Sequence, residues 1–200
     1  MSAAGAVKAV ARSLARVAVS PMVATFPMRA RLMGRDRAFQ ASCEWLSVVP
    51  GFVGQYVRRA FLAATAAGCG PDVVVGMGCK MASADVRLDA NAYVGPDCNL
   101  GWVHVERDVM MAAGVQIPSG PRTHGTERLD VPMRDQPGQH VCVHVREGAW
   151  LGNGAIVLAD VGRHAIVAAG AVVVDPVPDF AVVGGVPARL LKSRLDGTEP

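Results

Sequence analysis

The sequence predicts a mainly β protein, a parallel β-helix of six-residue repeats whose N-terminal α-helices cap one end. Three observations support this fold class. Apolar residues recur every six positions through the second half of the chain, small or turn-forming residues separate them, and aromatic residues make up only 5% of a chain that is 51% hydrophobic. A narrow coil lined by Val, Ala and Leu has little room for rings, so this composition suits its interior.

The six-residue pattern is clearest in residues 147–174. Each unit holds a small and a large apolar residue two positions apart, and such residues point to the same side of a strand. Each unit therefore predicts a very short strand followed by a turn, and a fixed short period predicts a solenoid. Two shorter intervals, Leu100 to Val105 and Val157 to Val161, should tighten a corner without ending the solenoid. The predicted inward pairs are Ala149/Leu151, Ala155/Val157, Ala165/Val167, Ala171/Val173, Ala92/Val94, Cys98/Leu100, Val109/Met111 and Val115/Ile117.

Residues 1–71 read as a helical cap, with helices expected at residues 6–19, 36–49 and 54–67. A β-helix has an open edge at each end, and helices can cover it. The first helix is amphipathic and basic: an apolar stripe of Val7, Val10, Leu14 and Val17 lies opposite Lys8, Arg12 and Arg16. Such a helix can lie on an anionic membrane surface or pack on the solenoid or a neighbouring subunit, and the sequence leaves both open. A transmembrane span is not expected, because Pro21 and Pro27 interrupt a short apolar run.

Charge is concentrated near the N-terminus. The whole chain has a formal net charge of +3, too small to indicate nucleic-acid binding, whereas residues 1–40 alone carry +6. The five cysteines form no C-x-x-C pair, and Cys98 occupies a small inward position, as expected of a reduced chain. We expect a cytoplasmic protein whose residues 1–40 contact the inner face of the membrane peripherally.

The solenoid is expected over residues 72–192, with a tail at 193–200 and one inserted loop at 119–140. A long loop inside a regular solenoid is usually functional or disordered. This loop holds His124, and histidine is the side chain whose ordinary pKa suits a general base near neutral pH. Glu127 and Asp130 are both candidates to orient its imidazole, and the spacing does not select between them.

The hexads and the His124 loop resemble the hexapeptide-repeat acyltransferase superfamily, in particular its sugar and maltose-type and polysaccharide-biosynthesis O-acetyltransferases. The resemblance covers roughly residues 72–192. It implies a left-handed β-helix with three hexads per coil, a homotrimer with sites between subunits, acetyl-CoA as co-substrate, and a loop histidine, here His124, that deprotonates the acceptor hydroxyl.

Three further segments carry the resemblance into the donor site. Residues 150–153 (WLGN), 167–170 (VAAG) and 185–189 (GVPAR) are similar to the family's W-I-G-N, V-I-G-A-G and G-x-P-x-R motifs. By this matching, Asn153 and Ala169 contact the coenzyme arm, while Arg189 and Lys192 pair with its phosphates. The family's Thr-Lys pair after the last hexad is Val174-Asp175 here, which puts the phosphate contacts in question.

We therefore expect an acetyl-CoA-dependent O-acetyltransferase acting on a saccharide hydroxyl in surface polysaccharide or glycolipid assembly. His124 is the base, attack on the thioester is direct, and no metal is expected. Two alternatives from other classes are a trimeric zinc hydratase with ligands drawn from His124, His140 and His144, and a non-catalytic scaffold. Trp102 and Trp150 fall in outward positions and are expected at subunit interfaces.

Overall fold

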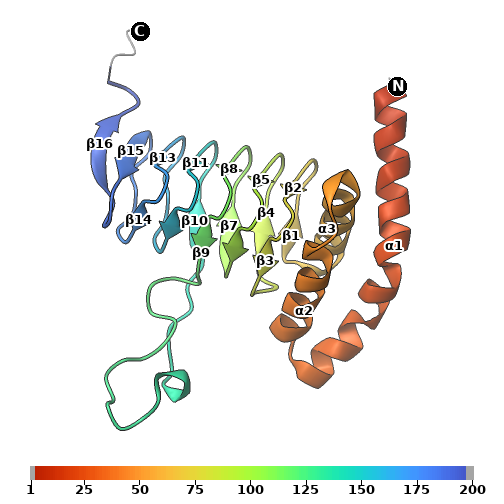
Figure 1. Cartoon of the computed structure of the whole chain (residues 1–200), viewed down its shortest axis with the longest axis horizontal. Coiled ribbons are helices and arrows are strands. Elements are labelled where there is room, and N and C mark those ends of the chain that lie inside the picture. The colour runs from red at the N-terminus through yellow and green to blue at the C-terminus, as the bar shows by residue number, and fades with distance from the viewer. Residues whose placement is uncertain (1–2, 197–200) are drawn as a thin grey trace.

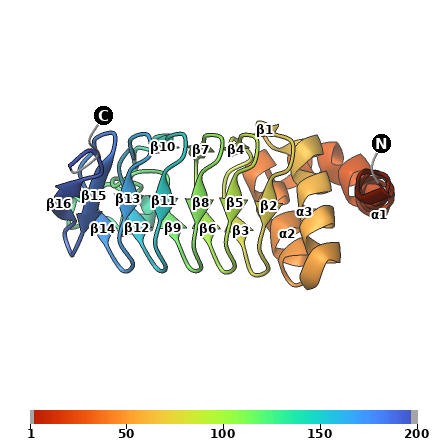
Figure 2. The same ribbon diagram turned by 90° about the horizontal axis from the view of Figure 1, so that it is seen from above.

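The computed structural model describes residues 3–196; residues 1–2 and 197–200, which belong to the expected cap and tail, lie outside the described residues. Three helices come first, α1 (Ala3–Met33), α2 (Arg35–Ser47) and α3 (Gly51–Thr65), and a stack of short strands follows (Figure 1). The helices cover the end of the stack where the first strands lie (Figure 2). The predicted fold class is confirmed: parallel coils form a mainly β solenoid with a helical cap at one end.

Successive coils contribute strands to three parallel sheets, called A, B and C in the order in which the chain meets them. Each coil passes through all three sheets, so its turns form A–B, B–C and C–A corners. The first strand, β1, lies before the start of the solenoid expected at residue 72. Sheet A contains β1 (Gly68–Cys69), β4 (Arg87–Leu88), β7 (Val103–Val105) and β10 (Val143–Val145). Sheet B contains β2 (Val74–Val75), β5 (Tyr93–Val94), β8 (Met110–Met111), β11 (Trp150–Leu151), β13 (Ile166–Val167) and β15 (Ala181–Gly184). Sheet C contains β3 (Lys80–Met81), β6 (Asn99–Leu100), β9 (Gln116–Ile117), β12 (Ile156–Val157) and β14 (Val172–Val173).

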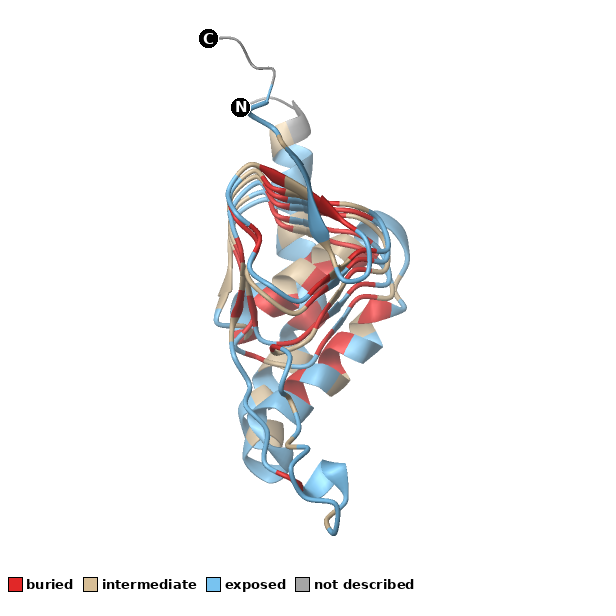
Figure 3. Cartoon of the chain, turned by 90° about the vertical axis from the view of Figure 1, so that its left-hand side faces the viewer, coloured by how far each residue is buried: buried red, intermediate tan, exposed pale blue. Residues whose placement is uncertain are grey.

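The interior of the coils is the one that the repeat predicts. Every predicted inward pair is buried, with exposed fractions of at most 1%. Viewed along the stack, buried residues line the inside of the three-sided coils (Figure 3). The two shortened intervals tighten corners without ending the stack, because β7 pairs with both β4 and β10 and Val161 bridges Val145 and Val177.

The cap closes the first coil through polar as well as apolar contacts. Phe39 of α2 and Phe61 of α3 are fully buried, with ring centroids 5.8 Å apart. Arg58 of α3 is also buried, and its Nε donates to Val75 O at 3.0 Å, while Nη1 donates to Val49 O at 2.7 Å. Burial lowers the pKa of this guanidinium. A buried arginine at the solenoid edge satisfies carbonyls that a bare end would expose to water.

Helix α1 is much longer than the expected helix at residues 6–19. It continues through Pro21, where the Ser20 hydroxyl donates to Val17 O at 2.8 Å and satisfies the carbonyl that proline cannot reach. Its inner face packs against the other helices through Ala15, Val19 and partly buried neighbours. The predicted apolar stripe lies on the other side: Val7, Val10, Leu14 and Val17 are 59–70% exposed. None of the helices in the described residues is both long and apolar enough to span a membrane.

Two irregular segments complete the fold. Between β9 and β10 the chain leaves the C–A corner as a long loop that projects from the stack and contains a short 3-10 helix, η1 (Met133–Asp135) (Figure 1). At the far end, β16 (Arg189–Ser193) turns back and pairs antiparallel with β15, so it ends sheet B with an antiparallel strand. The loop and β16 carry three of the five residues proposed for the site.

Candidate active site

The projecting loop has a defined internal structure. Its two legs are joined at the base, where Val141 N donates to Ser119 O at 3.0 Å, and further out, where Gln139 N donates to Arg122 O at 2.7 Å. Gln136 is buried in the loop, and its Nε2 donates to the carbonyls of Arg128 (2.6 Å) and Val131 (2.9 Å). These bonds hold the loop in one shape although most of its side chains are exposed.

The backbone at His124 is in direct contact with the returning leg. A Cβ at Gly138 would lie 2.1 Å from Thr123 O and 2.6 Å from His124 N. Only glycine fits so close an approach. Gly138 therefore helps to set the position of the candidate base.

His124 is exposed and lines a hollow of ≈ 500 Å³ within the loop, together with Arg122, Thr126, Glu127 and Gln139. Within residues 3–196, no group hydrogen bonds to its imidazole. An exposed imidazole beside an open hollow is free to accept a proton from a bound hydroxyl.

Neither candidate orienting residue contacts His124. Asp130 is held by Arg128, whose Nε and Nη2 donate to its two oxygens at 3.1 and 2.5 Å, and this pairing holds the pKa of Asp130 below its ordinary value. Glu127 accepts a hydrogen bond from Thr126 N at 3.1 Å and lines the same hollow as His124. Of the two, only Glu127 lines the hollow of His124.

Asn153 and Ala169 are brought together. Both lie at the B–C corner of successive coils, after β11 and β13, and Gly170 N donates to Asn153 O at 2.8 Å. Gly152 packs so closely on the next coil that a Cβ there would lie 2.5 Å from Ala169 N. Both residues are exposed and adjoin across successive coils, and together they are called the donor strip.

Arg189 and Lys192 both lie on β16, beyond the last coil, and both are exposed. Arg189 Nη1 is 3.9 Å from Asp175 Oδ2 and donates to Ala188 O at 3.0 Å. The aspartate that replaces the family's lysine thus lies beside the arginine expected to meet phosphate. This pairing lowers the positive potential available to an anionic ligand.

The two halves of the expected site lie on different corners of one chain. The His124 loop leaves at the C–A corner, whereas Asn153 and Ala169 occupy the B–C corner, on the other edge of sheet C. A single chain therefore does not bring the candidate base and the candidate donor strip together.

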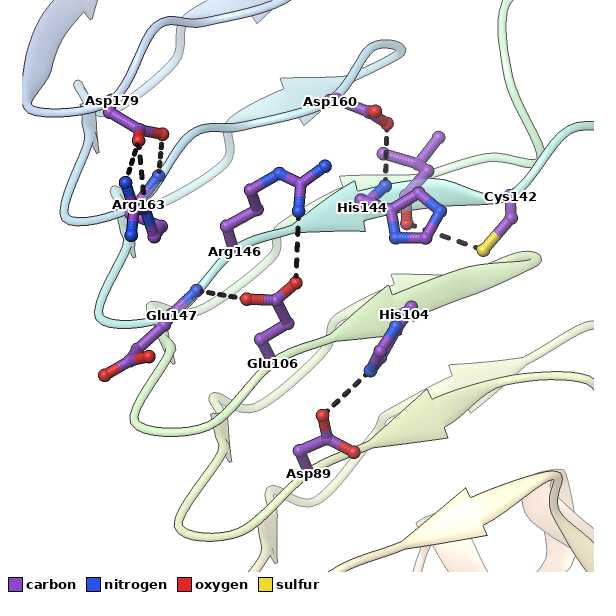
Figure 4. Close-up of polar contacts among 11 residues, drawn as sticks. Asp89, His104, Glu106, Cys142, His144, Arg146, Glu147, Asp160, Arg163 and Asp179 are labelled. Carbon is purple, nitrogen blue, oxygen red and sulfur yellow. Dashed lines mark hydrogen bonds and ion pairs between the residues drawn. The ribbon is translucent and has the colours of Figure 1, made fainter.

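Two of the remaining histidines, His104 and His144, lie on sheet A. His104 and His144 are partners in register on sheet A, with ring centroids 5.6 Å apart, and His104 Nε2 is 2.8 Å from Asp89 Oδ2 (Figure 4). The zinc alternative needs His144 beside His124, but His144 belongs to this strand column. In residues 3–196 there is no group of three or more His, Cys, Asp or Glu side chains that could hold a metal ion.

A pair of hollows at the base of the loop was not predicted. Trp102, expected at an interface, lies at the shortened C–A corner, where its backbone N–H donates to Ser119 Oγ at 2.9 Å. The short interval between Leu100 and Val105 was the available signal that this corner is unusual. The first hollow, of ≈ 320 Å³, is lined by Asp36, Ala82, Ser83, Asp85, Trp102, Ser119 and His140.

Comparison with known proteins supports the resemblance. No family model matches the chain. It is 47% identical over 49 residues to the serine acetyltransferase of Haemophilus influenzae, a match that covers 24% of this chain and 18% of that protein. The chain thus spans less than a fifth of the length of this relative.

Solved structures share the fold. A maltose O-acetyltransferase from Clostridium difficile 630 superposes with a TM-score of 0.69 at 20% identity, over 81% of this chain and 88% of that one. The N-acyltransferase AntD from Bacillus cereus, solved in complex with dTDP and coenzyme A, superposes with a TM-score of 0.55 at 16% identity, over 62% and 72% of the two chains. The protein therefore shares the β-helix fold of these acyltransferase structures, and this is the fold that the resemblance implies.

Proposed function

We propose that the protein is an acetyl-CoA-dependent O-acetyltransferase that acts on a hydroxyl of a saccharide, in the assembly of a surface polysaccharide or glycolipid. The observation that carries this proposal is His124, an exposed imidazole at an open hollow on the one long loop of the described solenoid. The shared fold with a maltose O-acetyltransferase and the local identity to a serine acetyltransferase support acyl transfer to a hydroxyl.

In the proposed reaction His124 accepts the proton of the acceptor hydroxyl. The oxygen attacks the thioester carbonyl carbon, the carbon–sulfur bond breaks, and the departing coenzyme thiolate takes the proton back from the imidazolium. Backbone N–H groups beside the thioester stabilise the oxyanion that forms on the way. No covalent enzyme intermediate is needed, so no serine or cysteine nucleophile is assigned.

The donor coenzyme is proposed to lie along the B–C corner. Asn153 and Ala169 are exposed and are proposed to contact its pantetheine arm, while Arg189 and Lys192, on β16 beyond the last coil, are proposed to meet its phosphates. Because Asp175 partly neutralises Arg189, we expect Lys192 to contribute more to phosphate binding than Arg189 does.

A thiol-release assay with acetyl-CoA tests the proposal. The acceptor panel contains maltose, the methyl glycosides of glucose, galactose and N-acetylglucosamine, and serine, since the curated relative is a serine acetyltransferase. We expect thiol release with a saccharide and not with serine. Release with serine alone would replace the saccharide acceptor by an amino acid, and no release with any acceptor would contradict acyl transfer.

His124→Ala is the matching variant test. It should lower the turnover number by about 100-fold or more, since general base catalysis contributes that much, while coenzyme A affinity stays unchanged. His104→Ala serves as the control, because His104 lies on sheet A and lines neither the hollow of His124 nor the hollows at the base of the loop. Full activity of His124→Ala would remove the assignment of the base.

A homotrimer is proposed because one face of the chain is suited to it. The outward residues of sheet B form an apolar column in register through the coils, in which Tyr93, Met110 and Trp150 are 42–47% exposed. The equivalent column of sheet A is polar, with Arg87, His104 and His144. Association through sheet B buries the apolar column and gives each chain neighbours that can complete its site.

Peripheral membrane contact is proposed through the outer face of α1. Its exposed stripe continues beyond Val17 to Met28 and Leu32, which are 58% and 78% exposed. Some of the basic residues among the first forty make contacts within the chain: Arg29 donates to Ser42 Oγ, and Arg35 pairs with Asp85. Lys8, Arg16, Arg31 and Arg37 have no carboxylate partner among the described residues, and each such cation near an anionic surface contributes about 1 kcal/mol.

Vesicle co-sedimentation tests this contact. Leu14→Asp should weaken binding to vesicles of anionic phosphatidylglycerol, since it places a carboxylate in the stripe without touching the inner face of α1. Leu129→Asp is the matched control, because Leu129 is fully exposed on the loop. If the wild type does not bind these vesicles at low salt, the stripe is not a membrane contact.

A further inference from the structure

The two hollows at the base of the loop form one continuous trough from the cap toward His124. The first lies between the start of α2 and Trp102, and the second, of ≈ 360 Å³, extends over the outer face of sheet C. They share Ala82, Ser119 and His140, so they adjoin. The second hollow reaches Thr123, the residue before the candidate base. The trough therefore runs from the cap to the residue that precedes the candidate base.

The walls of the trough combine an aromatic ring with many uncharged hydrogen-bonding groups. Trp102 lies at the edge of the trough and is 36% exposed. Ser83 and Ser119 supply hydroxyls, and Asn99 and Gln116 on sheet C supply amides. An indole face covers the apolar face of a sugar ring, while hydroxyls and amides both donate to and accept from sugar hydroxyls.

The charges of the trough disfavour an anionic occupant at its cap end. Asp36 and Asp85 both line the first hollow. Asp85 is paired with Arg35, whereas the described partner of Asp36 is the backbone N–H of Ala84, at 2.8 Å. A carboxylate without a cationic partner repels phosphate and carboxylate groups and accepts hydrogen bonds from neutral hydroxyls.

We propose that this trough is the acceptor subsite and that it binds an uncharged saccharide unit, with Trp102 as its stacking platform. The proposal rests on the proposed function, since it supplies the acceptor for His124. It assigns to Trp102 the binding of substrate in place of the subunit contact expected from the sequence. It also explains why the trough begins at the cap: an acceptor carried on a lipid would enter beside the C-terminal end of α1.

The first test measures acceptor kinetics. Using the saccharide that the wild type acetylates fastest, Trp102→Ala should raise the acceptor KM by about tenfold with the KM for acetyl-CoA unchanged. Trp102→Phe should recover most of the loss, because a ring that only stacks can be replaced by another ring. Trp45→Ala is the control, since Trp45 is 75% exposed on α2 and lies outside the trough. Wild-type acceptor KM in Trp102→Ala would overturn the subsite.

The second test does not depend on catalysis. Hydroxyl-radical footprinting of the wild type without acetyl-CoA, in the presence of each saccharide of the panel, should protect Trp102 and leave Trp45 unprotected. Protection of Trp102 without thiol release would keep the subsite and remove the proposed reaction. Thiol release without protection of Trp102 would keep the reaction and overturn the subsite.

Discussion

At the scale of single residues, the candidate base is positioned by backbone and not by a charged partner. His124 lacks a carboxylate contact in the described chain, and Asp130 is held by Arg128 instead. The position of the imidazole depends on the contact between Gly138 and the backbone of Thr123 and His124. The position of the base therefore depends on a glycine, a residue that brings no catalytic side chain of its own.

Gly138→Ala should lower the turnover number although it leaves every assigned catalytic side chain in place. The added methyl group cannot fit 2.1 Å from Thr123 O, so the backbone at His124 must shift. A displacement of about 1 Å at a catalytic group can reduce the rate by about 100-fold. Steady-state kinetics and coenzyme A titration measure the effect, and coenzyme A affinity should not change.

Leu129→Ala is the control for this variant, because Leu129 is a fully exposed residue of the same loop that does not line the hollow of His124. Equal turnover in Gly138→Ala and Leu129→Ala would show that the loop accommodates the methyl group and that the base does not depend on this contact.

At the scale of elements, the three sheets have different outer surfaces although their interiors are alike. The inner positions repeat small and large apolar residues along the coils. They determine how the coils stack, and they do not distinguish one sheet from another. The outer positions differ by face: apolar on sheet B, charged and imidazole-rich on sheet A, amide-containing on sheet C. Ion pairs such as Arg163 with Asp179 and Arg146 with Glu106 extend along the A–B corner (Figure 4). The outer residues that could serve a function on this solenoid therefore differ from one face to the next and from one corner to the next.

Met110→Arg should convert the proposed trimer into monomers. The substitution places a charge in the middle of the sheet B column, where association would bury it without a partner, while the interior of the coil is untouched. Light scattering measures the mass, which for the wild type should be three times 20.9 kDa. His104→Arg on sheet A is the control and should stay trimeric. A monomeric wild type with full activity would contradict the trimer.

At the scale of the whole molecule, the loop and the donor strip occupy different corners of the triangle. The loop leaves between sheets C and A, while Asn153 and Ala169 lie between sheets B and C. A rigid solenoid cannot fold its own corners together, because each coil contacts only its neighbours. A complete site therefore calls for the loop of one copy beside the B–C corner of another.

Coexpression of two inactive variants tests this arrangement. His124→Ala lacks the base, and Ala169→Trp blocks the donor strip with a bulky ring at an exposed position. In randomly mixed trimers about a quarter of the sites combine an intact loop with an intact strip, so activity should return to about a quarter of the wild-type value. Each variant alone should be inactive. Absence of activity in verified mixed trimers would place loop and strip of one site in the same chain.

The coil interior and the helical cap could be predicted from the sequence because they depend on local patterns. The six-residue spacing places Leu151, Cys98 and the other residues of the predicted inward pairs inside the coil, independently of the residues on its outer surface. All of them are buried as predicted. The length of α1 was not predictable in the same way. The amphipathic stripe predicted a helix over residues 6–19, whereas the Ser20 hydroxyl and packing against α2 and α3 allow the helix to continue to Met33.

The sequence by itself determined the repeat, the interruption at residues 119–140 and the candidate base within it, since each is a property of residues close together in the chain. The tertiary structure decided which distant residues meet. It placed Arg58 on the carbonyl of Val75, Asp175 beside Arg189, and Trp102 and Asp36 on the lining of one hollow. The physical reason is that each coil returns the chain to the same face, so neighbours in space come from different coils and their pairing follows from the register of the stack.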